Sequence, residues 1–343
     1  MSRLLAIEQR RGRDDDAPWV VEGGRRVPGQ EHNRRLSELQ AGLMRHTGVR
    51  ALPAEATDEH VEQVLGALHE PGYLSALRAV RSTEPILLPE LAAPGVAPDI
   101  PVSAGLVAAA HEGVRTAITA AQGTVAGARF TYALCRPPGH HAGPAWFGGY
   151  CYLNNTAAAV HTLREGGAQS VGILDLDLHY PNGTSAIVAP WADVTLHSLH
   201  SWPAPHAPTL EVLPRTSRER LVEFRSAPAL APYLDAVAAS LRTLSQSCTV
   251  LVLSLGYDTV AGDPHGSWSF PPEVFTPIGS LLAASGLPVC VVQEGGYALE
   301  ALAACSYAFA AGLLGGGAAG VGQPGRSRRP NALASTTPGG GRA

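Results

Sequence analysis

The sequence predicts one α/β domain in which helices flank a mostly parallel sheet. Two observations lead to this fold class. Short apolar or β-branched runs recur in the second half of the chain, and longer amphipathic stretches separate them, which is the pattern of parallel strands joined by crossover helices. In addition, 45% of the 343 residues are hydrophobic and 16% are charged, so the chain can bury a large core.

Residues 30–122 are expected to be mostly helical. Apolar side chains recur there at helical spacing in two groups, Leu36, Leu39, Leu43 and Met44, and Val61, Val64, Leu65 and Leu68. We interpret both groups as faces that pack into the core.

Strands are expected from residue 129 onward. The runs are 129–135, 170–176, 193–199, 249–255 and 288–293, and five is a minimum number. From about Leu314 the chain is rich in glycine, proline and arginine, and its apolar surface is too small to offset the entropy of ordering. We therefore expect a single domain over 1–313 and a flexible tail over 314–343.

The composition argues against several classes of protein. The 25 basic residues, all arginine, and the 29 acidic residues give a formal net charge of -4, which leaves no broad positive surface for nucleic acid or an anionic membrane. The absence of lysine excludes Schiff-base, P-loop and lysine-nucleophile chemistry. The five cysteines form no CxxC pair, so no disulfide scaffold is indicated. Without a signal peptide or a long apolar segment, the expected location is the cytoplasm.

Polar side chains accompany the end of every predicted strand. In chain order they are His140 and His141, then Asp175, Asp177 and His179, then His197, Ser198 and His200, then Tyr257 and Asp258, and finally Glu294 and Tyr297. In open α/β sheets, ligands bind outside the carboxyl ends of the strands, where the loops meet. Five such strand ends in succession predict a shared polar site.

The residues after the second predicted strand have the spacing of a metal site. Asp175, Asp177 and His179 lie two residues apart, so on an extended segment all three point to one face. Two carboxylates beside an apolar strand repel each other unless a cation lies between them. Asp258 could complete a three-ligand set for zinc with one position open, and the imidazole makes calcium or magnesium a poorer fit. The alternative is that the aspartates cap the next helix and His179 is a core histidine.

Histidine and tyrosine side chains supply candidate acid–base groups. The doublet His140–His141 follows two prolines and a glycine, and histidine is the natural general acid and base near neutral pH. Asp175 would raise the basicity of one imidazole, and Asn182 would leave the other closer to neutral. Tyr297 follows two glycines, which could let its hydroxyl approach a carbonyl. The alternatives are a surface turn for the histidines and a packing role for the tyrosine.

These motifs together resemble a known family, the zinc-dependent histone deacetylases and acetylpolyamine amidohydrolases. The matching strings are HEPGYLSAL (69–77), RPPGHHAG (136–143), FGGYCYLNN (147–155), DLDLH (175–179), SLH (198–200), SLGYDTVAGDP (254–264) and EGGY (294–297). The resemblance covers roughly residues 30–312 and is greater to the bacterial acetylpolyamine and class II-like branches. It implies the three-layer arginase-deacetylase fold, with the active site at the carboxyl ends of the strands.

The resemblance also implies roles for individual residues. One zinc ion per chain would be held by Asp177, His179 and Asp258. The catalytic set would be His141 as general base and then acid, His140 paired with Asp175, Asn182 facing His141, and Tyr297 polarising the substrate carbonyl. A structural potassium ion would be bound by Asp175, Ser198 and the backbone of Asp177, His179 and Leu199. The substrate tunnel would be lined by Gly149 and Tyr150, with Trp202 opposite and Asp99 as an acidic residue at the rim.

The activity that the resemblance implies is removal of an acetyl or other short acyl group from an amine by metal-activated water. The partner would be an acylated amine, either an acyl-lysine peptide or an acylpolyamine, and a homo-oligomer is left open. The family commonly has a second histidine and a glycine where this chain has Tyr180 and Pro181, which affects the loop that carries Asn182. Two alternatives follow, a catalytically silent metal-binding protein of the same fold and a two-metal ureohydrolase.

Overall fold

The computed structural model describes residues 3–10, 16–93, 96–202 and 216–315. Within these ranges, eight strands form one sheet in the order β4-β1-β5-β10-β9-β6-β7-β8, and every neighbouring pair is parallel. The strands are β1 (Leu4–Glu8), β4 (Val49–Pro53), β5 (Phe130–Leu134), β6 (Val171–Asp175), β7 (Val194–Ser201), β8 (Glu219–Phe224), β9 (Val250–Leu255) and β10 (Val289–Gln293). Because all strands run the same way, their carboxyl ends meet along one edge.

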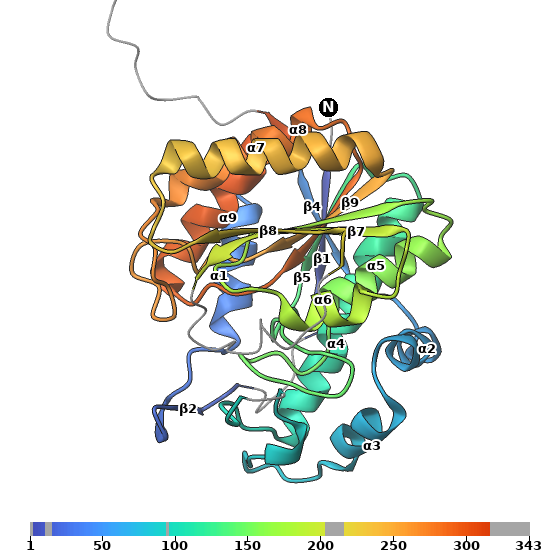
Figure 1. Ribbon diagram of the computed structural model, residues 1–343, viewed down its shortest axis with the longest axis vertical. Helices are drawn as coiled ribbons and strands as arrows, with labels where there is room; N and C mark the ends of the chain where they lie inside the picture. Colours follow the sequence, from blue (N-terminus) through green and yellow to red (C-terminus); the bar gives the residue numbers. More distant parts are fainter. Residues whose placement is uncertain (1–2, 11–15, 94–95, 203–215, 316–343) are drawn as a thin grey trace, which may run out of the picture.

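Helices cover both faces of the sheet and make three layers (Figure 1). One layer contains α1 (Arg34–Leu43), α7 (Leu230–Ser247), α8 (Phe275–Ala284) and α9 (Leu299–Leu314), and the other contains α4 (Ala104–Val125), α5 (Asn155–Glu165) and α6 (Asn182–Val188). Side chains alternate between the two cores along a strand: Leu251 and Leu253 of β9 pack with the first layer, and Val250 and Val252 with the second. Burial on both faces explains why the central strands read as continuous apolar runs.

Smaller elements form a third core, which lies next to the loops at the carboxyl ends of the strands. They are the hairpin of β2 (Trp19–Glu22) and β3 (Arg25–Pro28), helices α2 (Asp58–Leu68) and α3 (Pro71–Ala79), and the 3-10 turn η1 (Pro89–Leu91). A second 3-10 turn, η3 (Pro272–Val274), leads into α8. This core contains Tyr150 and Tyr297, so the packing of these elements reaches the predicted site.

Side-chain caps define where three of the helices begin. Thr57 accepts a hydrogen bond from the His60 N–H at the start of α2. Ser103 does the same for α4, and Asn154 for α5. Each cap satisfies a backbone N–H that has no partner within its helix. The Asn154 cap places α5 directly after the loop that carries Gly149 and Tyr150.

The predicted fold class is confirmed, with additions at the sheet edges. All five predicted runs are strands, and residues 34–43, 58–68, 71–79 and 104–125 are helical as expected. The stretch expected to be mostly helical also contains the five-residue strand β4, and the sequence analysis did not identify β4, β1 or β8. The edge strand β8 contains Glu219, Arg220 and Glu223, so it lacks the apolar run of a central strand. Helix α9 ends at Leu314, and residues 316–343 of the predicted tail lie outside the described residues.

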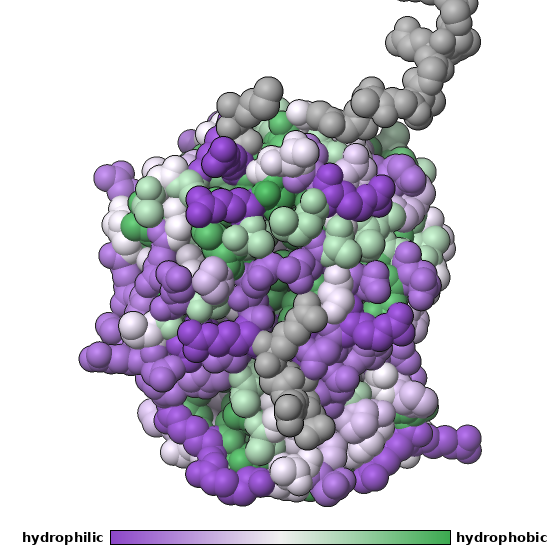
Figure 2. Space-filling model, turned by 180° about the vertical axis from the view of Figure 1, so that it is seen from behind, coloured by the Kyte–Doolittle hydropathy of each residue, from purple (hydrophilic) through white to green (hydrophobic). Residues whose placement is uncertain are grey.

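The surface agrees with the composition. On the face shown in Figure 2, hydrophilic residues predominate, and they interrupt the hydrophobic areas. Among the described helices, none combines the length and the apolar character needed to cross a membrane. All five cysteines are buried and free. The apolar side chains are therefore used mainly in the three cores described above.

Candidate functional site

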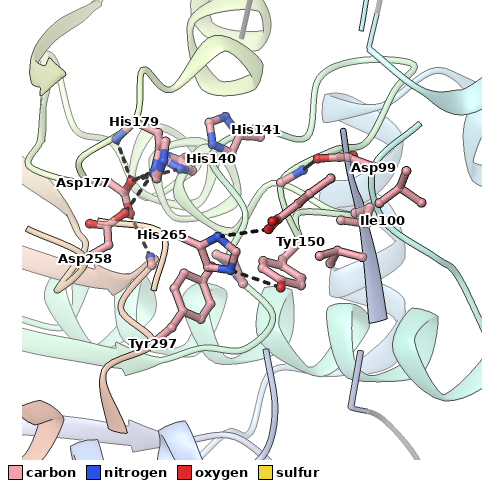
Figure 3. Close-up of a pocket in the computed structure, with 16 residues that line it drawn as sticks. Asp99, Ile100, His140, His141, Tyr150, Asp177, His179, Asp258, His265 and Tyr297 are labelled. Carbon is pink, nitrogen blue, oxygen red and sulfur yellow. Dashed lines mark hydrogen bonds and ion pairs between the residues drawn. The ribbon is translucent and has the colours of Figure 1, made fainter. Parts of the chain in front are cut away.

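One pocket opens at the carboxyl edge of the sheet and collects most of the predicted site residues (Figure 3). Its lining includes Asp99, His140, His141, Gly149, Tyr150, Asp177, His179, Asp258 and Tyr297. These side chains come from the loops after β5, β6, β9 and β10 and from the segment before α4. The sheet thus brings together residues that are up to 198 positions apart in the chain, from Asp99 to Tyr297.

Asp177, His179 and Asp258 form a buried cluster of potential ligands. One ligand atom from each lies within 4.8 Å of the others. The Nδ1 atom of His179 is 3.2 Å from Asp177 Oδ1 and 3.0 Å from Asp258 Oδ2. Two oxygen donors and one imidazole nitrogen are a donor set that suits zinc. The three side chains that the sequence predicts as ligands therefore meet at one point.

Glycines allow the backbone to approach these carboxylates closely. A Cβ atom at Gly256 would lie 2.2 Å from Asp177 Oδ2, and one at Gly295 would lie 2.7 Å from the same oxygen. The Gly295 N–H also donates to Asp177 Oδ2 at 2.9 Å, and the Leu178 N–H donates to Asp258 Oδ1 at 3.0 Å. These glycines and backbone N–H groups fix both carboxylates, and one oxygen of each, Asp177 Oδ1 and Asp258 Oδ2, faces His179. The residues therefore fit a small divalent cation.

The electrostatics of the cluster also favour a cation. Burial raises the pKa of Asp258 to about 7, and the nearby Asp177 carboxylate adds to this rise. Burial opposes ionisation of Asp177 too, but His140 and then His179 hold its pKa well below the ordinary value. Burial lowers the pKa of His179, yet hydrogen bonds to Asp177 and Asp258 raise it to about 10. Positive charge on this imidazole balances the carboxylates, and a divalent cation would supply that charge and displace the proton.

The adjacent histidines His140 and His141 have opposite environments. His140 Nδ1 lies 3.3 Å from Asp175 Oδ2, and its Nε2 lies 3.6 Å from Asp177 Oδ1. Burial lowers the pKa of His140, but Asp177 and then Asp175 raise it to about 10. For His141, burial followed by the charges of His140 and His179 holds the pKa well below its ordinary value. These environments favour a protonated imidazole at His140 and a neutral one at His141.

Asn182 determines which nitrogen of His141 carries the proton. The two side chains approach to 2.6 Å between His141 Nδ1 and Asn182 Oδ1. Because the amide oxygen can only accept, Nδ1 is the donor, and Nε2 keeps its lone pair. With Tyr180 and Pro181 before it, Asn182 begins α6 and still contacts His141. Close packing explains this, since a Cβ atom at Gly183 would lie 2.3 Å from the Ala142 carbonyl oxygen.

Tyr297, in the loop after β10, lines the same pocket as Asp177, His179 and Asp258. Its ring lies 5.3 Å from the Tyr150 ring and 5.0 Å from the His265 ring, and the Arg35 guanidinium lies 4.5 Å from its centroid. Burial raises the pKa of the Tyr297 phenol well above its ordinary value, although Arg35 opposes the rise. The phenol is therefore a protonated hydrogen-bond donor at neutral pH.

A buried ion cluster supports this loop from below. Arg35 donates to the carbonyl oxygens of Gly296 at 2.7 Å and Glu294 at 2.6 Å. Glu31 receives Arg35 at 2.8 Å and also pairs with Arg136, and all three side chains are buried. The sequence prediction missed this cluster because charged residues of one helix and two loops carry no signal that they will meet inside the core.

The residues predicted to bind potassium are neighbours in the sheet. Asp175 and Ser198 are register partners on β6 and β7. Asp175 Oδ1 accepts the Asp177 N–H at 3.1 Å, and Ser198 Oγ lies 2.8 Å from His200 Nδ1. Leu199 is buried beside them. Their binding of a monovalent cation stays a prediction.

The predicted tunnel residues fall into two groups. Gly149 and Tyr150 line the pocket, and Asp99 Oδ2 accepts the Gly149 N–H at 3.0 Å. Trp202 is not among the lining residues. Its backbone N–H donates to the backbone carbonyl of Phe224, the last residue of β8. Residues 203–215, which follow it, lie outside the described residues.

The hairpin and His265 also line the pocket and were not predicted. Val20, Val21 and Glu22 form one wall of the pocket. Their strand β2 joins β3 through two glycines with φ of +55° and +75°, the geometry of a tight hairpin turn. This Gly-Gly turn between apolar residues is a signal that could have identified the hairpin. His265 lies within the GYDTVAGDPHG segment, but nothing in that pattern indicates that its ring faces Tyr297.

Replacing Gly149 with alanine should strongly reduce the deacylase activity that the resemblance implies. Gly149 has φ of +54°, and an added Cβ would lie 2.5 Å from His141 Cδ2. Because backbone strain and contact would both displace His141, we expect kcat to fall about 100-fold, the cost typical of a misplaced catalytic group. Gly127→Ala is the control, since Gly127 has φ of +95° but no atom within 4 Å of an added Cβ. Steady-state kinetics would compare the two, and equal losses would contradict a specific contact with His141.

Comparison with known proteins gives a consistent result. The family model described as histone deacetylase domain matches residues 29–313. Acetylpolyamine amidohydrolase 1 of Pseudomonas aeruginosa is 36% identical over 212 residues, 60% of this chain and 61% of the relative. Acetylpolyamine amidohydrolase of Mycoplana ramosa is 37% identical over 205 residues, 57% of this chain and 60% of the relative. The aligned region thus spans about three fifths of the length of these two relatives.

A curated sequence and a solved structure from Burkholderia pseudomallei extend the comparison. Its acetylpolyamine amidohydrolase is 34% identical over 276 residues, 78% of this chain and 77% of the relative. A crystal structure of acetylpolyamine aminohydrolase from the same species has a TM-score of 0.79 and 27% identity, and the superposition covers 92% of this chain and 99% of that chain.

Proposed function

Because this chain belongs to the histone deacetylase family, we propose that it is a zinc-dependent amidohydrolase that removes an acetyl group from an acetylated polyamine. The observation that carries the proposal is the arrangement in the pocket: Asp177, His179 and Asp258 form the donor cluster, and His141 and Tyr297 face the same cavity. The alternatives of a silent binding protein and a two-metal ureohydrolase are not favoured, since the relatives carry the names of deacetylases and amidohydrolases.

The metal would be held by Asp177, His179 and Asp258. A bound zinc ion supplies Lewis-acid activation of water and of the substrate carbonyl. His140 keeps its positive charge through Asp175 and Asp177 and offsets negative charge nearby.

Proton transfer falls to His141. Its Nδ1 proton is committed to Asn182, so Nε2 takes the proton from the attacking water and later delivers it to the leaving nitrogen. Tyr297 donates a hydrogen bond to the carbonyl oxygen of the amide, which gains charge as water adds. One water is consumed, the C–N bond breaks, and the products are acetate and a free amine.

The choice of polyamine rests on charge at the pocket mouth. Two carboxylates line the pocket outside the cluster, Asp99 and Glu22, and the Glu22 side chain is 45% exposed. An acetylated polyamine carries ammonium groups along its chain, which carboxylates bind by charge-assisted hydrogen bonds. The relatives named as acetylpolyamine amidohydrolases support the same substrate class.

A substrate panel tests the proposal. We expect zinc-loaded protein to release acetate from N-acetylputrescine and N-acetylspermidine with higher kcat/KM than from an acetyl-lysine peptide. The control is His141→Ala, which removes the proton acceptor and should be inactive on every substrate. A wild-type protein that contains zinc and releases no acetate from any of them would contradict the proposed reaction. A preference for the peptide would contradict only the substrate class.

Neutralising the carboxylates at the mouth should weaken binding of charged substrates. For Asp99→Asn and Glu22→Gln, we expect KM for N-acetylputrescine to rise about tenfold, in line with loss of one charge-assisted hydrogen bond. The KM for N-butylacetamide, which has no ammonium group, should stay within about twofold. Asparagine at position 99 keeps an acceptor for the Gly149 N–H, so the loop should hold. Equal rises for both substrates would show that the carboxylates act on pocket structure instead.

Potassium binding, an oligomeric state and a cytoplasmic location stay predictions. The proximity of Asp175 and Ser198 supports a cation site at the end of β6. The five free cysteines are compatible with a reducing compartment.

A further inference from the structure

Asp263 is a buried carboxylate that the proposed reaction does not use. Its side chain is 7% exposed and accepts three backbone hydrogen bonds. Oδ2 receives the N–H groups of Tyr297 at 2.6 Å and Ala298 at 3.0 Å. Oδ1 receives the N–H of His265 at 3.0 Å. One carboxylate thus joins two segments of the pocket wall.

Asp263 accepts the N–H groups of Tyr297 and Ala298, whereas Arg35 holds the preceding carbonyls of Glu294 and Gly296. The segment that carries Tyr297 therefore has an anchor of its own. It follows two glycines, of which Gly296 has φ of +117°, and it precedes α9. Ala298 occupies the N-cap position of α9, where its side chain offers no acceptor. Asp263 accepts the N–H groups of Ala298 itself and of Tyr297 before it, so it fixes the chain where it enters α9, and the helix N-terminus favours its negative charge.

The other segment leads from Asp258 to His265 and folds back on itself. The Val260 N–H donates to the Tyr257 carbonyl, and the Asp263 N–H donates to the Val260 carbonyl. A Cβ atom at Gly266 would lie 2.5 Å from the Asp258 carbonyl oxygen, so the turn closes tightly. Asp263 is therefore held at a constant position relative to the proposed metal ligand Asp258.

His265 adds a contact between the same two segments. Its ring packs edge-on against the Tyr297 ring at 5.0 Å, and its Nε2 lies 3.3 Å from the Tyr150 hydroxyl (Figure 3). The rings of Tyr150, His265 and Tyr297 surround one side of the pocket. Movement of the Tyr297 backbone would separate these rings and shift the phenol away from the cluster.

We propose that Asp263 is a positioning residue. It holds the Tyr297 phenol at a set distance from the ligand cluster of Asp177, His179 and Asp258. The inference rests on the proposed function, because Tyr297 needs positioning only if its hydroxyl takes part in the reaction. Asp263 touches neither substrate nor reacting atoms. It acts through the backbone of Tyr297 and Ala298 on one side and of His265 on the other.

The chemistry of the side chain explains why a carboxylate is required. Two oxygens can accept all three N–H groups, whereas an asparagine of the same shape would present an NH₂ group to at least one N–H donor. Burial raises the pKa of Asp263, and the three backbone donors oppose that rise and favour the ionised form. The Asp263→Asn variant therefore removes the negative charge and at least one of the three hydrogen bonds without leaving a cavity.

The test is a double-mutant cycle between Asp263→Asn and Tyr297→Phe, measured by steady-state acetate release from N-acetylputrescine. In the wild-type background we expect kcat to fall about 30-fold with KM within about twofold and zinc content unchanged, within the range for a displaced catalytic group. In the Tyr297→Phe background the same change should cost less than about twofold, because the phenol to be positioned is gone. Glu273→Gln, which removes an exposed carboxylate next to α8, is the control.

Several outcomes would overturn the inference. An equal loss in both backgrounds would assign Asp263 to general stability of the pocket. The cycle is repeated with Asp263→Ala, and failure of both variants to fold, judged by melting temperature, would likewise assign the residue to the fold. Inactive wild-type protein would contradict the proposed function itself, so the two failures are distinguishable.

Discussion

Replacing Asp258 with alanine is expected to yield a folded protein that retains no zinc after dialysis and releases no acetate. Catalytic zinc sites use three protein ligands. Here the loop after β6 would supply Asp177 and His179, and the loop after β9 would supply the third, Asp258. Without it, Asp177 and His179 are left with too few donors to hold the ion. Zinc content by mass spectrometry and acetate release would be measured on the same sample.

The matched control for this variant is Asp235→Ala. Asp235 is exposed on α7, away from the pocket, so its loss should change neither zinc content nor rate. If the Asp258→Ala protein kept one zinc ion per chain and full activity, Asp258 would not be a ligand. Loss of zinc together with a large fall in melting temperature would be checked against metal-free wild-type protein, which should show a similar fall.

Replacing Tyr297 with phenylalanine is expected to lower kcat by about 100-fold to 1000-fold while zinc stays bound. That range is typical when one hydrogen-bond donor to a developing oxyanion is removed. The phenylalanine ring can keep the contacts with Tyr150, His265 and Arg35, so the pocket should retain its shape. KM should change little, because the bond to the substrate oxygen strengthens mainly in the transition state.

Tyr307→Phe is the control for this change. Tyr307 lies on α9, where its ring packs against Arg45, and it is not among the residues that line the pocket. Loss of its hydroxyl should therefore leave kcat unaltered. Steady-state kinetics on N-acetylputrescine with zinc quantified would compare both variants. A Tyr297→Phe enzyme with wild-type kcat would show that the phenol takes no part in the reaction and that carbonyl activation rests on the metal ion alone.

Much of the site could be predicted because its residues follow strands with continuous apolar runs. The strands β6 and β9 are buried on both faces, so their sequences differ clearly from the polar residues after them. Since carboxyl ends of parallel strands share one edge, Asp177 and Asp258 were expected to meet. The contrast in charge between His140 and His141 also followed from the partners assigned to each.

Other features could not be predicted, and the reason is physical in each case. The apolar run of β1 is only the four residues LLAI, β4 (VRALP) contains an arginine and ends in proline, and β8 is an edge strand with charged residues. The ion pair of Glu31 with Arg35 is stabilised by contacts that form only when α1 packs beside the loop after β10. His265 and Trp202 depend on the direction of loop backbones, which spacing does not encode. His265 directly follows the string SLGYDTVAGDP (254–264), but the sequence does not show where its ring points. Trp202 was expected opposite Gly149 and Tyr150, and it is not among the residues that line the pocket.

The most direct test of the central claim is a zinc titration of metal-free protein with acetate release from N-acetylputrescine measured at each step. If Asp177, His179 and Asp258 hold one catalytic ion, the rate should rise linearly to one equivalent of zinc per chain and then stay constant. A rate that is already maximal without zinc, or that reaches its maximum only at two equivalents, would contradict a single-metal site built from these three residues.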